Sequence, residues 1–267
     1  MKKYFFLIAI LVSGLVYNYY SRVSLDEVVD KHKIIGYDYR LFQGTPYWNL
    51  AKAIYYDDLT AIDQIIKTDT LNINYQEPIW GGTLLRFAVH SQKYEVSKLL
   101  LDLGANPNIH DFRNGESVIT EAVDDKILIG DKTKFLKLLL KYGANPNDEE
   151  AVMPDNKTSM RYSALAKACT NNLEIVKLLV EAGANINYTN ETIMSPLFEA
   201  VSQKKYDIVL YLLEKGADPN QVLVTRPNGM QLRLIDFLKE DEDEVTFSWQ
   251  KTEFNKVKAY LVSKGTQ

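Results

Sequence analysis

Short apolar runs with helical spacing recur along the chain, and the same polar phrase follows each of the clearest ones. The runs are KLLLDL, KLLLKY, VKLLVEA and LYLLEK. The phrase Gly-Ala-Asn/Asp-x-Asn follows them at residues 104–108, 143–147, 183–187 and 216–220. Apolar residues that lie three and four positions apart form one face of a helix. The pattern therefore predicts amphipathic helices that end at a fixed signal.

The recurring phrase has the chemistry of a helix stop. Glycine adopts the left-handed conformation at a helix C-terminus without a steric penalty. Pro107, three residues after Gly104, cannot continue a helix. Asn106 and Asn108 are residue types that hydrogen-bond their own backbone and hold a turn. Each copy is therefore expected to end one helix and to begin a loop.

A shorter helix signal lies before each apolar run. It begins with Thr or Ser and ends with Ala, as at residues 83–88, 163–168 and 195–200. The glycines of successive phrases, at positions 104, 143, 183 and 216, are 39, 40 and 33 residues apart. A helix-turn-helix unit that recurs at this period indicates a solenoid, because each pair buries its apolar faces only against its neighbours. We expect an all-α solenoid of about six helix-turn-helix repeats over residues 44–267.

The two ends of the array and two internal stretches depart from this period. The first repeat, residues 44–76, has Asn-Ile-Asn at 72–74 where the phrase falls, but it lacks the Gly-Ala. The last unit, residues 221–267, is longer and looser. Terminal repeats of a solenoid are atypical because they turn one face to water, so both are predicted to be caps. The inserts at 124–131 and 148–162 also break the period, and their roles stay open.

The N-terminal segment differs from the rest of the chain. Lys2 and Lys3 precede an uncharged apolar run at positions 4–16, which is typical of an export signal. The run continues through the tyrosine-rich residues 17–20, so two alternatives stay open: a cleaved signal peptide or an uncleaved anchor. The lysines predict that the N-terminus stays in the cytoplasm and that the remainder is exported.

Three parts are therefore expected. Residues 1–22 are the signal peptide or signal anchor, residues 23–43 are a linker that packs on the first repeat, and residues 44–267 are the repeat domain. The protein is predicted to be periplasmic, either soluble or tethered to the inner membrane by residues 4–20. It is also expected to be a monomer.

Composition and charge exclude several classes of partner. The chain carries a formal net charge of −4 with a pI near 5.5. Without a strong positive field it is not expected to bind nucleic acid, and it is expected to meet the membrane only through the N-terminal segment. The single cysteine, Cys169, excludes an intramolecular disulfide and a cysteine metal cluster.

Candidate chemistry is sparse. Cys169 is interpreted as a buried structural thiol, because no histidine lies near it in sequence. His90 and His110 lack the carboxylate spacing of a metal site. The acidic stretches near Asp124 and at 240–244 are interpreted as solvated loops. Neither a Gly-rich phosphate loop nor a Gly-x-Ser-x-Gly motif occurs. We therefore expect no catalysis, no cofactor and no metal.

The full unit resembles the ankyrin repeat. Its parts are Thr/Ser-Pro-Leu-x-x-Ala, Glu-Ile/Val-Val-x-x-Leu-Leu and Gly-Ala-Asp/Asn-x-Asn, and the match spans roughly residues 44–265. The resemblance implies a stack of antiparallel helix pairs joined by hairpin-like loops, and a role in binding other proteins. The family's usual His after Pro-Leu is replaced by Arg86, Thr120, Ala166 and Phe198. This departure predicts that the family's hydrogen-bond network is weakened.

In the architecture that the resemblance implies, the loop tips and the exposed side of each first helix line one concave surface. The predicted loop-tip residues are Tyr75, Trp80, Phe112, Arg113, Tyr162, Tyr188 and Arg226. The predicted exposed first-helix residues are Phe87, His90, Glu121, Asp124, Lys167 and Glu199. Aromatic and arginine side chains are enriched where proteins bind proteins. We therefore expect this set to bind a folded protein.

A second resemblance concerns the role. The segment Phe42-x-Gly44-Thr45-Pro46-x-Trp48-x-Leu50-Ala51, behind an export signal, resembles bacterial envelope ankyrin proteins. Some of those proteins act as immunity proteins against secreted lipase-type toxins. The resemblance implies a non-catalytic module that binds and neutralises a secreted toxin. The alternative is a periplasmic scaffold or protective partner of an endogenous enzyme such as a catalase.

Overall fold

The computed structural model describes residues 24–34, 36–124, 131–152, 161–170, 172–190, 193–242 and 248–265. The predicted export segment at 1–22 lies outside these residues, as do the central parts of both predicted inserts. The chain divides into two compact units, the first ending at Leu71 and the second beginning at Asn72. The predicted all-α repeat fold is confirmed: in the described residues the α-helices follow one another in pairs, interrupted by one short hairpin.

The first unit holds residues 24–43 against one helix pair. It contains two 3₁₀ turns, η1 (Lys31–Lys33) and η2 (Tyr39–Phe42), and the helices α2 (Trp48–Tyr55) and α3 (Leu59–Thr68). The helices pack on each other, and η2 packs on α2. The Gln43 side-chain amide donates to the carbonyl oxygens of Leu25 and Glu27 at 2.7 and 2.8 Å. These bonds fix the lead segment beside the helix pair.

The second unit stacks four helix pairs and ends with a looser one. The pairs are α4 (Leu84–His90) with α5 (Tyr94–Asp102), α6 (Val118–Ala122) with α7 (Lys132–Lys141), α8 (Ala164–Cys169) with α9 (Leu173–Glu181), and α10 (Pro196–Ser202) with α11 (Tyr206–Glu214). The last part contains the antiparallel hairpin β1 (Val224–Thr225) and β2 (Gln231–Leu232), then α12 (Leu234–Asp241) and α13 (Ser248–Ser263).

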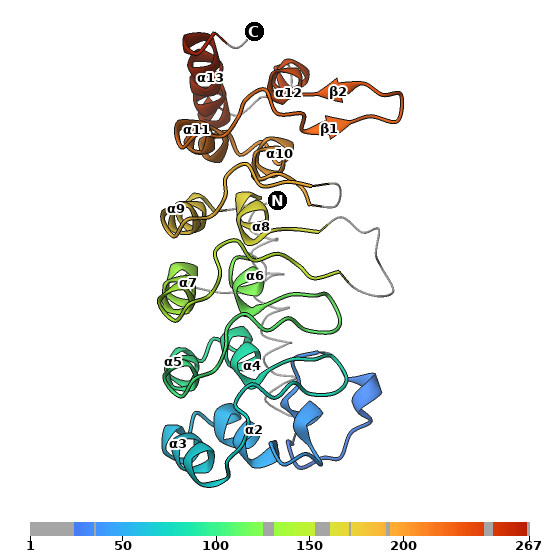
Figure 1. Ribbon diagram of the computed structural model, residues 1–267, viewed down its shortest axis with the longest axis vertical. Coiled ribbons are helices and arrows are strands. Elements are labelled where there is room, and N and C mark those ends of the chain that lie inside the picture. The colour runs from blue at the N-terminus through green and yellow to red at the C-terminus, as the bar shows by residue number, and fades with distance from the viewer. Residues whose placement is uncertain are drawn as a thin grey trace. The chain divides into compact units, whose positions relative to one another are not determined.

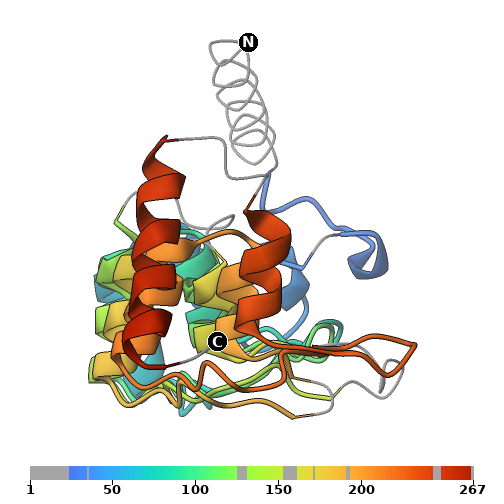
Figure 2. The ribbon, with the colours of Figure 1, turned by 90° about the horizontal axis from the view of Figure 1, so that it is seen from above.

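Within this unit the helices form two rows, which Figures 1 and 2 show from two sides. The inner row is α4, α6, α8 and α10, and the outer row is α5, α7, α9 and α11. Each inner helix contacts the next inner helix, and α9 contacts both α7 and α11. The loops that precede the inner helices project to one side of the stack (Figure 2). We call the surface formed by the inner row and these loops the inner face.

Three of the inner helices begin with the same hydrogen bond. The hydroxyls of Thr83, Ser163 and Ser195 accept from the backbone amide three residues later, at 3.2–3.3 Å. A hydroxyl at this position satisfies one of the amides that a helix N-terminus leaves open. Ser117, before α6, differs because its hydroxyl donates to the Asp148 carboxylate instead. The Thr/Ser of the sequence pattern is therefore a helix cap in three of the four inner helices.

The core lies between the two rows and between successive pairs. The alanines that end the shorter helix signal of each repeat, Ala88, Ala122, Ala168 and Ala200, are fully buried. The apolar runs of the outer helices bury Val96, Leu100, Leu136, Leu139, Ile175, Leu179, Val209 and Leu212. Small residues in the inner row let neighbouring helices approach, while branched residues fill the space between the rows.

Among the described helices, none combines the length and the apolar character needed to cross a bilayer.

The recurring phrase ends each outer helix and also joins the repeats. Gly104 has φ +96°, a left-handed conformation that favours glycine. The first asparagine of the phrase acts as predicted, since the Asn106 side chain accepts from the Asn108 amide at 2.9 Å. The prediction of a local bond was wrong for Asn108. Its Oδ1 accepts from the Asn145 amide at 2.8 Å, and its Nδ2 donates to the Gly143 carbonyl at 2.9 Å.

The same pair of bonds recurs at each junction between complete phrases. Asn147 bonds to the Asn185 amide and the Gly183 carbonyl, and Asn187 bonds to the Asp218 amide and the Gly216 carbonyl. The incomplete first copy contributes half of the pattern, because the Asn74 side chain accepts from the Asn106 amide at 2.7 Å. The second asparagine is thus a tie to the next repeat.

Candidate functional site

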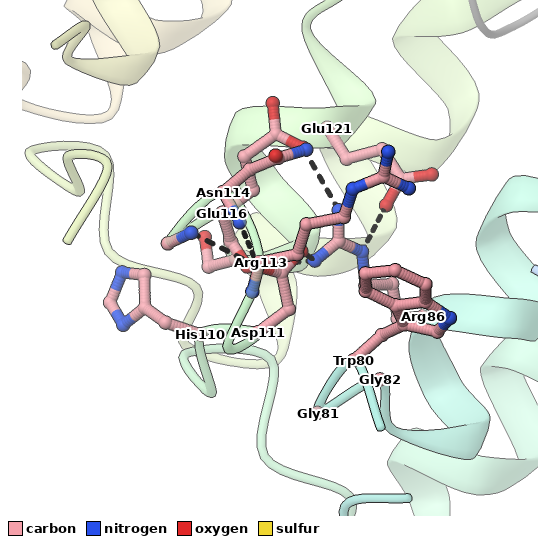
Figure 3. Close-up of polar contacts among 12 residues, drawn as sticks. Trp80, Gly81, Gly82, Arg86, His110, Asp111, Arg113, Asn114, Glu116 and Glu121 are labelled. Atoms are coloured by element: carbon pink, nitrogen blue, oxygen red, sulfur yellow. Dashed lines mark hydrogen bonds and ion pairs between the residues drawn. The ribbon is translucent and has the colours of Figure 1, made fainter. Parts of the chain in front are cut away.

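A buried arginine organises the polar side of α4 and α6. Only 3% of Arg86 is exposed. Its Nε donates to Glu121 at 2.6 Å and its Nη2 to a Glu116 carboxylate oxygen at 2.9 Å (Figure 3). Its Nη1 contacts Asp111 and donates to the Glu116 carbonyl at 3.0 Å. The prediction that the departures from His weaken the network was wrong at Arg86, because a guanidinium offers five donors in a fixed fork.

The loop before α6 closes over Arg86 through Asp111. While one carboxylate oxygen of Asp111 meets Arg86, the other accepts from the amides of Arg113, Asn114 and Gly115 at 2.7–3.0 Å. A carboxylate that accepts several amides and an arginine fixes the loop conformation, because a buried unpaired charge is costly. The position of the loop tip is therefore set by the buried charge beneath it.

Three of the predicted loop-tip residues meet above this cluster. The Arg113 guanidinium lies 4.6 Å from the centre of the Trp80 ring, a cation–π contact. The Phe112 amide donates to the Trp80 carbonyl at 2.7 Å, and the Phe112 side chain is 56% exposed. Glu77 supports this loop from below by accepting from the amides of Trp80 and Gly82 at 2.9 and 3.1 Å. We call Trp80, Phe112 and Arg113 the aromatic tip.

Some predicted first-helix residues are not exposed. Phe87, Glu121 and Glu199 are buried, so the expectation of exposed side chains was wrong for them. The reason is that each inner helix contacts its neighbours in the row, which covers the position before the alanine of the pattern in three of the four repeats; Lys167, at the same position of α8, is half-buried. Glu121 is enclosed between two partners, with one oxygen on Arg86 and the other 2.7 Å from His90 Nδ1.

A second charged cluster surrounds Lys167 on α8. Its Nζ contacts Glu116 and lies 3.4 Å from Glu150 and 3.8 Å from Asp124. Glu116 joins the two clusters, because one of its oxygens meets Lys167 and the other meets Arg86. Burial lowers the pKa of Lys167, but Glu116 and Glu150 outweigh it and hold that pKa above its usual range. Lys167 therefore stays charged.

The carboxylates around Lys167 respond differently to burial. Burial would raise the pKa of Glu116, yet Lys167 and Arg86 together keep it below its usual range. For Glu150, burial prevails and raises the pKa. Burial also raises the pKa of Glu199, on the neighbouring α10, to about 7. The charge of the cluster therefore depends on pH near neutrality.

Four of the predicted residues, Lys167 among them, line one cleft. The cleft measures about 350 Å³ and is lined by Asp124, Glu150, Tyr162, Lys167, Thr170, Glu199 and Gln203. They come from the end of α6, the loop before α8, α8 itself and α10. We call this feature the acidic cleft. Its sequence-predicted members are Asp124, Tyr162, Lys167 and Glu199.

The remaining predicted residues lie apart from the tip and the cleft. Tyr188 interacts with Glu149, a contact that raises the pKa of the Tyr188 phenol. Arg226, next to the β1–β2 hairpin, pairs with Glu240 at 2.7 Å. Tyr75 is half-buried at the end of the incomplete first phrase. His90 contacts Glu121 and is half-buried.

Three residues that shape the site were not predicted as site residues: Arg86, Glu116 and Glu150. Their partners lie 17 to 51 positions away in sequence, beyond the reach of any local pattern. The available signal was Arg86 itself, a charged residue in an apolar segment that must be paired if it is buried.

Cys169 is fully buried, and burial raises the pKa of its thiol well above the usual value, which disfavours the reactive thiolate.

Comparison with known proteins identifies the repeat. The family model for ankyrin repeats in three copies matches residues 130–222, and the model for the single ankyrin repeat matches residues 80–112. The solved ankyrin repeat protein EF0377 superposes with a TM-score of 0.58 at 25% identity, over 79% of this chain and 96% of that one. An ankyrin repeat domain from Acinetobacter baumannii AYE gives a TM-score of 0.59 at 24% identity, over 78% and 94%. The chain thus carries ankyrin repeats, and its fold is that of an ankyrin-repeat protein.

Curated relatives share the repeat over part of their length. Ankyrin repeat protein FPV034 of Fowlpox virus (strain NVSL) is 32% identical over 169 residues, which cover 63% of this chain and 28% of that protein. Protein phosphatase 1 regulatory subunit 27 of Mus musculus is 49% identical over 69 residues, which cover 26% of this chain and 42% of that protein. This chain spans less than half the length of either relative. Ankyrin repeats are protein–protein interaction modules, and their fold is generally a non-catalytic scaffold.

Proposed function

We propose that this protein binds and neutralises a secreted toxin on the periplasmic side of a bacterial envelope. The observation that carries the binding role is that the aromatic tip and the acidic cleft both lie on the inner face of one repeat array. Both are held by one buried network, in which Glu116 joins Arg86 to Lys167. A surface whose side chains are fixed before binding loses less entropy when a partner docks.

The chemistry of the two features suits a folded protein partner. Tryptophan and arginine dominate the binding energy of many protein interfaces, since tryptophan buries a large rigid ring and arginine offers a planar group with five donors. The exposed Phe112 side chain adds apolar area at the same tip. The acidic cleft supplies charge complementarity, which raises the association rate and rejects partners of the wrong charge.

Export and toxin neutralisation rest on the N-terminal sequence and on the resemblance to envelope immunity proteins. Lys2 and Lys3 followed by the apolar run at 4–16 favour export. A reporter enzyme that is active only in the periplasm, fused after residue 267, tests this. Activity is expected, and a reporter that stays inactive in the cytoplasm would overturn the location.

Partner capture tests the role. Affinity purification of the tagged full chain from its native envelope, followed by mass spectrometry, is expected to recover a secreted toxin encoded nearby. Expression of this protein together with that toxin should restore the growth that the toxin alone inhibits. Recovery of an endogenous enzyme instead, with no protection against any neighbouring toxin, would replace the immunity role with the scaffold role.

Matched variants locate the binding surface. Trp80→Ala combined with Arg113→Ala should weaken capture by about 100-fold, as loss of an interface hot spot does. Lys98→Ala combined with Asp102→Ala is the control, because it removes an exposed ion pair of α5 in the outer row. Equal capture by both double variants would move the binding surface away from the aromatic tip.

A further inference from the structure

In the part of the chain that the structure describes, the acidic cleft contains a buried carboxylate without a counter-charge. Glu199 lies on α10 and is 5% exposed. Among the described residues, no cation lies within ion-pair distance of its carboxylate and no donor bonds to it. An isolated buried carboxylate is unfavourable unless it is protonated or paired. Glu199 is one of the residues that line the cleft, so a ligand there would meet it.

Among the described residues, Lys167 is the one cation that lines the cleft, and it does not balance the carboxylates there. Lys167 makes its closest contact with Glu116, which lies toward Arg86. Its other contacts are longer, 3.4 Å to Glu150 and 3.8 Å to Asp124. With Glu199, three acidic side chains therefore face the cleft, and Lys167 is already engaged by Glu116.

We propose that the acidic cleft receives one arginine side chain of the protein partner. The inference rests on the proposed binding function and names the chemistry that the partner presents. A guanidinium stays charged, and its five donors can bond to several carboxylates at once. In this arrangement the arginine faces Glu199 and Glu150, and Gln203 and Thr170 also line the cleft.

A metal ion does not fit the same position. Within the described part of the chain, no three His, Cys, Asp or Glu side chains are placed to hold a metal. The Lys167 ammonium lies between the carboxylates that would have to converge on a metal ion. A flexible organic cation, by contrast, can meet Glu199 without displacing Lys167.

The test is an NMR titration of the isotope-labelled full chain. The probes are Nα-acetyl-arginine methylamide and its citrulline counterpart, which has nearly the same shape and no charge. Arginine is expected to shift the amides near Glu199 and Thr170 in a saturable way, and to bind at least about tenfold more tightly than citrulline, because a charge-assisted bond is lost. Equal shifts with both probes would overturn the proposal.

Variants make the test specific. Glu199→Gln keeps the size of the side chain and removes an unpaired buried charge, so it should fold normally and bind the arginine probe about tenfold less tightly. Glu95→Gln, an exposed residue of the outer helix α5, is the control and should bind like the unmodified chain. Undiminished arginine binding by Glu199→Gln would refute the site.

Capture of the partner separates this inference from the proposed function. If the arginine probe does not bind while a protein partner is still captured, protein binding stands and the cleft assignment fails. If the probe binds through Glu199 and no protein is captured, the cleft assignment stands and the proposed function fails.

Discussion

Arg86 and Glu121 form a buried ion pair across two successive repeats, with Nε and a carboxylate oxygen 2.6 Å apart and with 3% and none of their side chains exposed. The pair matters because each partner is also bonded elsewhere, Arg86 to Glu116 and Glu121 to His90. A buried pair of this kind is costly to break on one side, since the remaining charge has neither water nor a partner.

Replacing Arg86 by Met should therefore destabilise the protein strongly. Three carboxylates would lose their shared cation, and removal of one partner from a buried pair costs about 3–5 kcal/mol. Urea denaturation followed by circular dichroism measures the free energy of unfolding. Lys67→Met, which removes an exposed ion pair with Asp63 on α3, is the control and should change the stability by less than about 1 kcal/mol. A loss as small as the control's would mean that the cluster contributes no net stability.

The asparagine ties between repeats should be measurable one at a time. Asn147→Ala removes the bonds to the Asn185 amide and the Gly183 carbonyl and is expected to cost about 1–2 kcal/mol. Asn220→Ala is the matched control, because it alters the same position of the final phrase, where the described residues show no corresponding tie. Thermal unfolding of the two variants should differ by several degrees. Equal melting temperatures would show that the ties do not stabilise the stack.

Glu199 should make stability depend on pH. Its pKa of about 7 in the folded protein lies above the ordinary value of 4.5 for a glutamate, so the folded state holds a proton that the unfolded state releases. Stability from this group is therefore full below about pH 4.5 and falls as the pH rises toward 7, by up to about 1.4 kcal/mol per pH unit. Urea denaturation at pH 5, 6, 7 and 8 should show this fall, and Glu199→Gln should flatten it. An unchanged slope in the variant would assign the pH dependence to other groups.

Cys169 should be protected from thiol reagents in the folded protein. The side chain is fully buried and burial raises its pKa, so both access and thiolate formation are disfavoured. Labelling with a maleimide should proceed at the rate at which the protein opens, and it should accelerate in urea in parallel with unfolding. Rapid labelling in buffer, at the rate of a free thiol, would contradict the packing of α8.

The periodic features of the fold were predictable, and the polar interior was not. The spacing of Gly104, Gly143, Gly183 and Gly216 indicated the repeat, because a helix stop leaves a local signature. Burial of Glu121 and Glu199 could not be predicted, since it depends on which side chains a neighbouring repeat places opposite them. For the same reason the sequence grouped Asp124, Tyr162, Lys167 and Glu199 with residues that lie elsewhere, such as Tyr188 and Arg226.

The second asparagine of the first three complete phrases couples each repeat to its neighbour. Within the described residues, the side chains of Asn108, Asn147 and Asn187 each bond to the following repeat. Folding free energy in such a stack is a sum over units and their junctions, so a defect at one junction separates two blocks that keep their own internal bonds. The Arg86 network and the acidic cleft cross the junctions from α4 to α10. A partner that binds at the cleft would contact several repeats at once. Binding would therefore raise the cooperativity of unfolding across these repeats.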